Sequence, residues 1–438
     1  MKPLESIRPR LGRRTFLQGA AAACGALAAP HVLPASALGR DGAVAPGDRI
    51  VMGGIGIGGR GSGDLGALLH EREVQFVAVC DCQRSRRETA KNMVDGRYGN
   101  KDCAAYRDLR DLLAERTDTD AVLIATGDRW HALASILAMR AGKDVYCEKP
   151  GTLTIAQGQA LVETARRYGR IFQSGIQRLS EDNFVVAGEL LRTGRLGKVH
   201  TVYAHLWGIP SWPRQHLDLP PEPEPPKEEL DWDLWLGPCP WRPFNQGYVQ
   251  GGWYREPDFA TGVAMWGSHT VAQCQVDLGL ADTAPIEYDF PPSGDAEGLT
   301  ARFASGVKLV MTRNGWRGSC GVRYEGTEGW VATADGYERP DVSTPSLLWD
   351  FRKLVNDHIA RTGHPIGHLR DFLDGIRLRR RCIAHEEVAH RTMSTNLVMD
   401  ICMDLKRSMK WDPAKEEFVG DAEANRLRSR ALRAPWSL

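Results

Sequence analysis

Several residues in this sequence have the types and spacing needed to bind a phosphorylated small molecule. Gly56, Gly58 and Gly61 follow the apolar run of residues 49–55 and match the pattern G-x-G-x-x-G. The first glycine of this pattern makes a tight turn, the second lets the backbone approach a diphosphate, and the third lets a helix pack against a strand. The following helix offers free N–H groups to the phosphates. The spacing therefore predicts a dinucleotide site, to which Gly59 and Arg60 also contribute.

Asp81 lies at the end of a second strand, predicted over residues 75–80. An acid in this position binds the ribose hydroxyls of NAD and repels the 2′-phosphate of NADP. Arg84, Arg86 and Arg87 follow closely, and an arginine can accept that phosphate. NAD is therefore the expected cofactor, and NADP is the alternative.

Lys149 is a candidate proton acceptor in the triplet Glu148-Lys149-Pro150, directly after the buried-type segment 144–147. Removing a hydride from a secondary alcohol requires a group that takes the hydroxyl proton, and an amine or an imidazole suits this task. In open parallel sheets, ligands bind beyond the carboxyl ends of the strands. We therefore expect Lys149 to lie beside the cofactor, and Glu148 to orient it or to contact the cofactor.

The elements that position these residues alternate between strands and helices, which is typical of a doubly wound parallel sheet. Strands are predicted over residues 49–55, 75–80, 120–125, 144–147 and 171–173, with helices over 130–141 and 155–168. Later strands are predicted over residues 199–206, 298–303, 307–313, 321–325 and 329–334. A helical zone is predicted over 366–410, with an interruption near 383–389. The stretch 219–230, rich in proline and acids, predicts an exposed loop that acts as a lid or as an arm onto a neighbouring subunit.

The ordered set of motifs resembles the Gfo/Idh/MocA family of oxidoreductases, which includes glucose–fructose oxidoreductase and inositol dehydrogenase. The set consists of the glycine loop, residues 126–131, residues 148–150 and residues 267–269. Residues 231–238, 325–330 and 411–438 further resemble an exported branch of the family found in planctomycete-type bacteria. The likeness covers roughly the whole chain after its first residues.

This resemblance implies an α/β chain with an N-terminal Rossmann domain and a C-terminal α+β domain built on an open, mostly antiparallel sheet. The expected divisions are a signal segment (1–37), a Rossmann domain (48–173), a substrate and oligomerisation domain (174–400) and a tail (401–438). The resemblance also implies NAD or NADP as cofactor and a sugar or cyclitol as small-molecule substrate. It further implies a homo-oligomer, either a dimer or a tetramer.

By the same resemblance, Lys149 is the catalytic lysine and His269 the catalytic histidine, and Thr126 and His131 belong to the cofactor-binding set. Gln177, Trp253, Tyr254 and Arg255 are candidate substrate contacts, because aromatic faces stack on sugar rings and arginine donates hydrogen bonds to hydroxyls. Arg178, Trp207 and Trp212 are further candidates for ligand contact.

One position departs from the family pattern. The family usually carries an aspartate four residues before the histidine, on the same helix face, and this chain has Met265 there. Three interpretations stay open. Lys149 and His269 suffice for catalysis; another acid, such as Asp258 or Glu256, replaces the missing one; or the chain binds its ligands with little or no activity.

Composition limits the classes of partner. The chain has 438 residues, 42% hydrophobic, and a formal net charge of +1. This near-neutral balance gives no reason to expect nucleic acid as a partner. The ten cysteines lack the spacing of zinc ligands, and nothing completes a tetrahedral site around His358, His364 and His368, so no metal is expected.

The leading hypothesis is an oxidoreductase that transfers a hydride between NAD(P) and a secondary hydroxyl of a sugar or cyclitol. A rival keeps the cofactor but oxidises the sugar only transiently. The adjacent C–H then becomes acidic, a glycosidic group is eliminated, and the hydride returns. The third hypothesis, motivated by Met265, is a sugar-binding protein without catalysis.

Residues 1–37 predict an export signal of the twin-arginine type. Arg13-Arg14 precede an apolar stretch over 16–29, and Ala35-Ser36-Ala37 forms a small-residue cleavage site. The expected location is periplasmic or otherwise outside the cytoplasm, with no membrane contact beyond this signal.

We predict that the mature protein begins near Leu38. Replacing both Arg13 and Arg14 by lysine should keep the unprocessed chain in the cytoplasm, because the twin-arginine route reads that pair. N-terminal sequencing of the exported protein measures the cleavage site, and exported protein that still carries Met1 would contradict the prediction.

Overall fold

A computed structural model describes residues 44–206, 216–313, 315 and 318–438. The expected signal segment (1–37), Trp207 and Trp212 lie outside these residues. The chain up to Arg49 forms one unit, whose described part contains the short 3-10 helix η2 (Pro46–Asp48). Residues 50–438 form a second compact unit, which contains all the candidate site residues within the described ranges.

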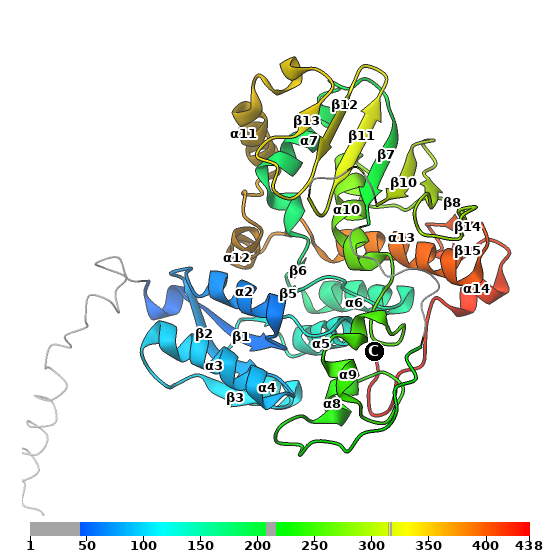
Figure 1. Ribbon diagram of the computed structural model, residues 1–438. Helices are drawn as coiled ribbons and strands as arrows, with labels where there is room; N and C mark the ends of the chain where they lie inside the picture. The colour runs from blue at the N-terminus through cyan, green and yellow to red at the C-terminus, as the bar shows by residue number, and fades with distance from the viewer. Residues whose placement is uncertain (1–43, 207–215, 314, 316–317) are drawn as a thin grey trace, which may run out of the picture. The chain divides into compact units, whose positions relative to one another are not determined.

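The first half of this second unit is a six-stranded sheet in the order β3-β2-β1-β4-β5-β6, and all of its strand pairs are parallel (Figure 1). Its strands are β1 (Ile50–Ile55), β2 (Val74–Cys80), β3 (Ala104–Tyr106), β4 (Ala121–Ile124), β5 (Asp144–Cys147) and β6 (Phe172–Ser174). Its helices are α2 (Gly59–Leu68), α3 (Arg84–Tyr98), α4 (Leu109–Glu115), α5 (Asp128–Arg140) and α6 (Ile155–Tyr168).

Both faces of this sheet are covered, which explains why β4 and β5 are apolar at nearly every position. In β4, Val122 and Ile124 pack with α4, α5 and α6, whereas Ala121 and Leu123 pack with α2 and α3 on the other face. The second face is completed by α12 (His368–Leu378), whose Phe372 and Leu373 are fully buried there. A helix from far along the chain therefore completes the core of the Rossmann domain.

The second half contains a nine-stranded mixed sheet in the order β13-β12-β11-β7-β10-β9-β8-β14-β15. The β7–β10 pair is parallel and the other pairs are antiparallel. Its strands are β7 (Val199–His205), β8 (Glu287–Asp289), β9 (Thr300–Arg302), β10 (Lys308–Thr312), β11 (Val322–Gly326), β12 (Trp330–Thr333), β13 (Asp341–Val342), β14 (Met409–Asp412) and β15 (Glu417–Phe418).

Helices α7 (Asp182–Arg192), α10 (Ala264–Asp277) and α13 (Glu386–Leu405) share one apolar core with this sheet. The remaining helices are η3 (Gln177–Ser180), α8 (Trp232–Leu236), α9 (Gln246–Val249), η4 (Gly252–Arg255), η5 (Pro345–Leu348), α11 (Phe351–Thr362) and α14 (Ala422–Arg426). Among the residues covered by the structure, none of the helices is both long and apolar enough to cross a bilayer.

The predicted fold class is confirmed, and the strands predicted in the second half lie within two residues of β7, β9, β10, β11 and β12. The predicted helical zone over 366–410 is wrong at its end. Helix α13 stops at Leu405 because Lys406 adopts a left-handed conformation, and Met409 then pairs with β8. The interruption also lies earlier than predicted, at 379–385, because Arg379 ends α12 in the left-handed region.

The expected division at residue 400 falls inside α13, and β14, beyond it, joins the mixed sheet through β8. Residues 216–226, which include the start of the predicted exposed loop, form neither helix nor strand. Leu230, at the end of that loop, is buried and forms an isolated antiparallel bridge with Gln83.

Candidate active site

A cavity of about 600 Å³ lies where the carboxyl ends of β4 and β5 face the glycine loop and the first turns of α10. It collects side chains from both halves of the unit. The predicted residues that line it are Gly58, Gly59, Arg60, Thr126, His131, Glu148, Lys149, Gln177, Arg178, Trp253, Tyr254 and His269.

The glycine loop leaves no room for side chains at its two ends. Gly56 has φ +70°, and a Cβ there would come within 2.8 Å of the Thr126 backbone. A Cβ on Gly61 would lie 2.7 Å from the Ala125 Cβ, so this glycine lets α2 pack directly on the end of β4. Both roles are those expected of the motif. A Cβ on Gly59 would meet nothing within 4 Å, so the backbone is open to a ligand there.

Arg60 connects the glycine loop to Glu148 and Asp64. Its guanidinium lies 3.3 Å from Glu148 Oε1 and 2.8 Å from Asp64 Oδ1. Gln177 also donates to Glu148 Oε1, at 2.6 Å. Burial, together with the negative charge of Glu148, raises the pKa of Asp64 to about 8. The pKa shift thus favours the protonated form of Asp64 beside Glu148.

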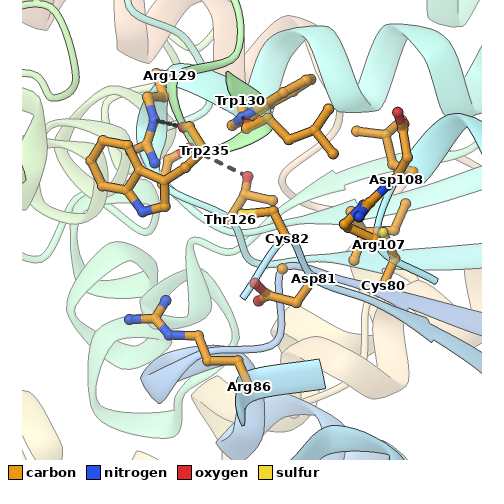
Figure 2. A pocket seen from close by; sticks show the side chains of 15 residues that line it. Cys80, Asp81, Cys82, Arg86, Arg107, Asp108, Thr126, Arg129, Trp130 and Trp235 are labelled. Atoms are coloured by element: carbon orange, nitrogen blue, oxygen red, sulfur yellow. Dashed lines mark hydrogen bonds between the residues drawn. The ribbon is translucent and has the colours of Figure 1, made fainter. Parts of the chain in front are cut away.

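A second pocket adjoins the glycine loop on the side of β2, and Asp81 and Arg86 both line it (Figure 2). Asp81 Oδ1 accepts a hydrogen bond from the Gln83 N–H at 2.8 Å, and burial raises its pKa despite the nearby arginines. In a Rossmann domain this is the adenosine side of the dinucleotide site. Asp81 lies where a ribose-binding acid is expected, and Arg86 reaches the backbone at Gly58, where an added Cβ would lie 2.9 Å from its Nη1.

Lys149 follows β5, and its amine is held by the second domain. Its Nζ donates to the carbonyl of Met265 at 2.8 Å and lies 5.1 Å from the centre of the Trp266 ring. The peptide bond from Lys149 to Pro150 is cis. The amine therefore lies between the end of the parallel sheet and the first turn of α10.

His269, on α10, lies 3% exposed in the same cavity. Its Nδ1 has no hydrogen-bond partner among the described residues, although the atom is buried. Burial, then the positive charge of Lys149, lowers the pKa of His269 well below the ordinary value. A buried polar atom without a partner is costly, and the described residues leave this nitrogen unpaired.

His131 and Asp128 lie on the first turns of α5. The ring nitrogens of His131 lie 2.6 Å from the Pro150 carbonyl and 3.0 Å from the Thr126 carbonyl, so this residue braces the loop that carries Lys149. Asp128 lines the cavity, and its Oδ2 accepts from the Thr261 N–H at 3.3 Å. Burial raises the pKa of Asp128, although the charges of His131 and Lys149 oppose that rise.

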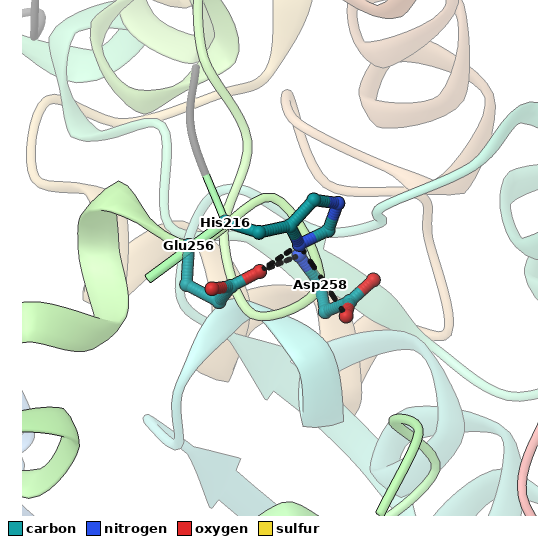
Figure 3. A group of neighbouring side chains, drawn as sticks. All are labelled: His216, Glu256 and Asp258. Carbon is teal, nitrogen blue, oxygen red and sulfur yellow. Dashed lines mark hydrogen bonds and ion pairs between the residues drawn. The ribbon is translucent and has the colours of Figure 1, made fainter. Parts of the chain in front are cut away.

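Glu256 and Asp258, the acids considered as replacements for the carboxylate missing at Met265, belong to a different cluster (Figure 3). His216 Nδ1 lies 2.6 Å from Glu256 Oε1, and Arg242 contacts Glu256 at 2.9 Å and Asp258 at 2.5 Å. The three residues His216, Glu256 and Asp258 offer ligand atoms close enough for a metal ion. Arg242 pairs with both carboxylates, and Arg430 lies 3.7 Å from Asp258, so two guanidinium groups already face the two acids. Of the described residues that line the cavity, the acids are Asp128 and Glu148.

His358, His364 and His368 do not share one site, because each forms hydrogen bonds with its own partners. His364 Nδ1 lies 2.8 Å from Asp371 Oδ1, and His358 Nδ1 lies 3.4 Å from Glu189 Oε1. His368 lies between the Ser180 hydroxyl and the Ser174 carbonyl, at 2.9 Å and 2.7 Å.

Some of the candidate substrate contacts line the cavity and others do not. Trp253 and Tyr254 line the cavity, whereas Arg255 is exposed and its guanidinium lies 5.5 Å from the centre of the Tyr254 ring. Arg178 pairs with Asp335 at 2.6 Å.

Sequence reasoning placed Asp128 at the ligand-binding end of the sheet without assigning it a role, because it follows a predicted parallel strand. It missed Arg129, Trp235, Val249 and Trp266 as lining residues. No sequence pattern pointed to Trp235, because it reaches the site only where its segment contacts the distant residue Arg129.

The described residues fit a dinucleotide. The open backbone at Gly59 and the cations Arg60 and Arg86 suit a diphosphate, Asp81 suits a ribose, and Lys149 and His269 line the same cavity. Each group lies where the strand ends of a Rossmann sheet place cofactor contacts.

Comparison with known proteins agrees with this geometry. Residues 49–176 match the family described as "Oxidoreductase family, NAD-binding Rossmann fold", and residues 198–438 match "Oxidoreductase family, C-terminal alpha/beta domain". The N-terminal half is therefore an NAD-binding Rossmann domain.

Two kinds of curated relative match part of the chain. Inositol 2-dehydrogenase of Salmonella typhimurium is 29% identical over 161 residues, 36% of this chain and 46% of that protein. A glycosyl hydrolase family 109 protein of Shewanella baltica is 34% identical over 171 residues, 35% of this chain and 37% of that protein. The match thus spans less than half the length of either relative.

Solved structures share the fold over more of the chain. The myo-inositol 2-dehydrogenase of Lactobacillus plantarum has a TM-score of 0.55 at 17% identity, covering 83% of this chain and 99% of that one. The WlbA dehydrogenase of Chromobacterium violaceum was crystallised with NADH and UDP-GlcNAcA. It has a TM-score of 0.60 at 17% identity, and the match covers 83% of this chain and 96% of that one.

We predict that the His269 imidazole stays neutral well below pH 6.5, the ordinary histidine value. Below about pH 6.5 this histidine binds a proton in the unfolded chain but not in the folded chain. The free energy of unfolding therefore decreases as the pH falls below about 6.5. NMR titration of ¹³C-labelled histidines measures this, and the His269→Gln variant assigns the signal. A His269 signal that titrates at pH 6.5 or above would contradict the electrostatic analysis.

Proposed function

The chain belongs to the Gfo/Idh/MocA oxidoreductase family, and from this premise we propose that it transfers a hydride between NAD(P) and a secondary hydroxyl of a sugar or cyclitol. NAD is the preferred cofactor in this proposal, because Asp81 lines the ribose side of the site. One observation carries the proposal. The side chains of Lys149 and His269 line one cavity together with the glycine loop of the NAD-binding domain.

The cofactor, when bound, accepts a hydride from carbon or returns it. The Met265 carbonyl, in the first turn of α10, holds the Nζ of Lys149. This amine takes the hydroxyl proton as the carbinol carbon becomes a carbonyl. In the reverse direction it gives that proton back. The bond to a main-chain oxygen leaves the amine anchored without a carboxylate.

His269 acts as a neutral imidazole, since burial lowers its pKa. A neutral ring can donate from one nitrogen and accept at the other, so it can orient the substrate hydroxyl toward Lys149. Asp128 supplies a carboxylate near Lys149 and takes the electrostatic role that Met265 cannot fill. Trp253 and Tyr254 offer faces for a sugar ring.

We predict that Lys149→Met lowers kcat by about 10²–10⁴-fold, the usual contribution of a general acid–base group. NAD binding should remain, because the glycine loop and Asp81 are untouched. Steady-state kinetics and NAD titration measure the two effects, and Lys353→Met, which removes an exposed lysine paired with Asp357, is the matched control. Normal turnover in Lys149→Met would remove the lysine from the mechanism.

A second function has specific support, because the chain is similar to family 109 glycosyl hydrolases over its N-terminal region. In this alternative, transient oxidation of a ring carbon acidifies the neighbouring C–H. Elimination of the glycosidic group follows, and the hydride then returns to the ring. Export by the twin-arginine route, which we propose from residues 1–37, favours a cycle that needs no supply of free NAD.

We predict different products for the two functions. A dehydrogenase forms one NADH per oxidised free sugar or cyclitol, whereas the redox-neutral enzyme cleaves a glycoside without net NADH. Absorbance at 340 nm and release of a chromogenic aglycone distinguish them on the same preparation. Retained ligand binding with neither product would identify a sugar-binding protein and contradict both enzymatic functions.

A further inference from the structure

Residues 228–237 lie along the adenosine side of the dinucleotide site, and we call them the strap. Leu234 and Trp235, in and after the first turn of α8, line the same pocket as Asp81 and Thr126 (Figure 2). They come from the second half of the chain, whereas the rest of that pocket belongs to the Rossmann domain. The strap therefore forms part of the wall around the space for adenosine.

The beginning of the strap is bonded to the loop after Asp81 through main-chain atoms. The Asp231 N–H donates to the Cys82 carbonyl at 3.1 Å, and the Arg84 N–H donates to the Glu229 carbonyl at 2.8 Å. Between these bonds, Gln83 and Leu230 form an antiparallel bridge. The loop that holds the ribose-binding acid is thus paired with the strap like two short strands.

The other part of the strap is bonded to α5. The Nε of Arg129 donates to the Trp235 carbonyl at 2.7 Å, and its guanidinium lies 3.7 Å from the centre of the Trp235 ring. The indole N–H of Trp130 donates to the Leu234 carbonyl at 2.9 Å. The two donors lie two and three residues after Gly127, which also lines the pocket.

Residues 430–436 hold the strap from its outer side. The Arg433 guanidinium donates to the carbonyls of Asp233 and Gly237, at 2.9 Å and 2.7 Å, and also pairs with the Asp233 carboxylate. The rings of Trp436 and Trp130 pack edge to face, with their centroids 4.9 Å apart. The strap is therefore clamped between the Rossmann domain and a second segment.

We propose that the strap is a closed clamp over the adenosine end of the cofactor site, so that the dinucleotide is retained from one turnover to the next. This inference rests on the proposed dinucleotide-dependent function. Release of the cofactor then requires the strap to open, and the rate of such local opening is set by the contacts that must break. The hydride removed from a carbinol carbon must accordingly return to a carbonyl carbon in the same cavity, of the same sugar or of a second one. The proton is given back to the resulting alkoxide oxygen.

The test is the rate at which the purified full-length protein exchanges bound NAD for isotope-labelled NAD. We expect the wild-type protein to keep about one NAD per chain through repeated desalting. Arg433→Ala should release NAD at least about tenfold faster, because one hydrogen bond to a charged group is already worth that factor and this arginine makes several to the strap. Arg407→Ala, which removes an arginine paired with Asp421 and Glu423 away from the strap, should leave the exchange rate unchanged.

Hydrogen exchange gives a second readout that does not depend on activity. The amides of Arg84 and Asp231, whose bonds join the strap to the Rossmann domain, should exchange faster in Arg433→Ala and in Trp436→Ala than in the wild type. Melting temperatures close to that of the wild type show that these variants are folded. Wild-type protein that turns over yet exchanges NAD as fast as Arg433→Ala overturns the strap and leaves the proposed function intact. Protein that binds no NAD under any condition overturns the proposed function itself.

Discussion

The buried carboxylate of Glu148 is the constraint on which the geometry of the site depends. It is 4% exposed, and a carboxylate so far from water must be paired or hydrogen-bonded. Its donors are the side chains of Arg60 and Gln177 and the main-chain N–H of Lys149. They belong to the glycine loop, to the start of the second half and to the candidate proton acceptor. Satisfying this single charge therefore fixes the cofactor loop, the domain junction and Lys149 relative to one another.

The same reasoning explains how the site accommodates Met265. A carboxylate beside His269 would favour the protonated ring, which can only donate. With Lys149 and Arg178 as its charged neighbours, the ring is held neutral, and it keeps one nitrogen able to accept a hydrogen bond. The Met265 carbonyl, which any residue at this position would provide, holds the lysine amine instead. The departure from the family pattern thus changes the charge balance of the site, while a main-chain oxygen at the same position holds the lysine amine.

The sequence was sufficient for the parts of the site that lie within one β–α unit. Gly56, Gly61 and Asp81 were identified because a strand, a loop and a helix follow one another within a short stretch. Lys149 was identified because its strand ends at the binding edge of a parallel sheet. Trp235 reaches the adenosine side through Arg129, and Arg433 reaches the strap from the far end of the sequence. No periodicity reports such pairings, because each one depends on the whole fold.

Glu256 was one of two acids left open as replacements for the carboxylate missing at Met265, and the sequence could not tell which cation it would meet in the fold. It directly follows the predicted substrate residues 253–255, yet it is fully buried with Arg242 and His216. A buried acid is stabilised by the strongest cation within reach, and Arg242 provides it. Met409 shows the same competition for a main-chain element, since pairing with β8 took this residue out of the predicted helical zone.

The two ends of the dinucleotide have different tasks, and this difference connects the strap to the net reaction. Contacts at the adenosine end are equally strong before and during hydride transfer, so tightening them leaves the chemical step unchanged and slows release. In a dehydrogenase that exchanges its cofactor in every cycle, slow release would limit turnover. In an enzyme that returns the hydride within the same cavity, slow release of the cofactor does not limit turnover. If the strap retains the cofactor as proposed, oxidation and reduction alternate on one bound dinucleotide, and both the redox-neutral cycle and hydride transfer between a pair of sugars satisfy this condition.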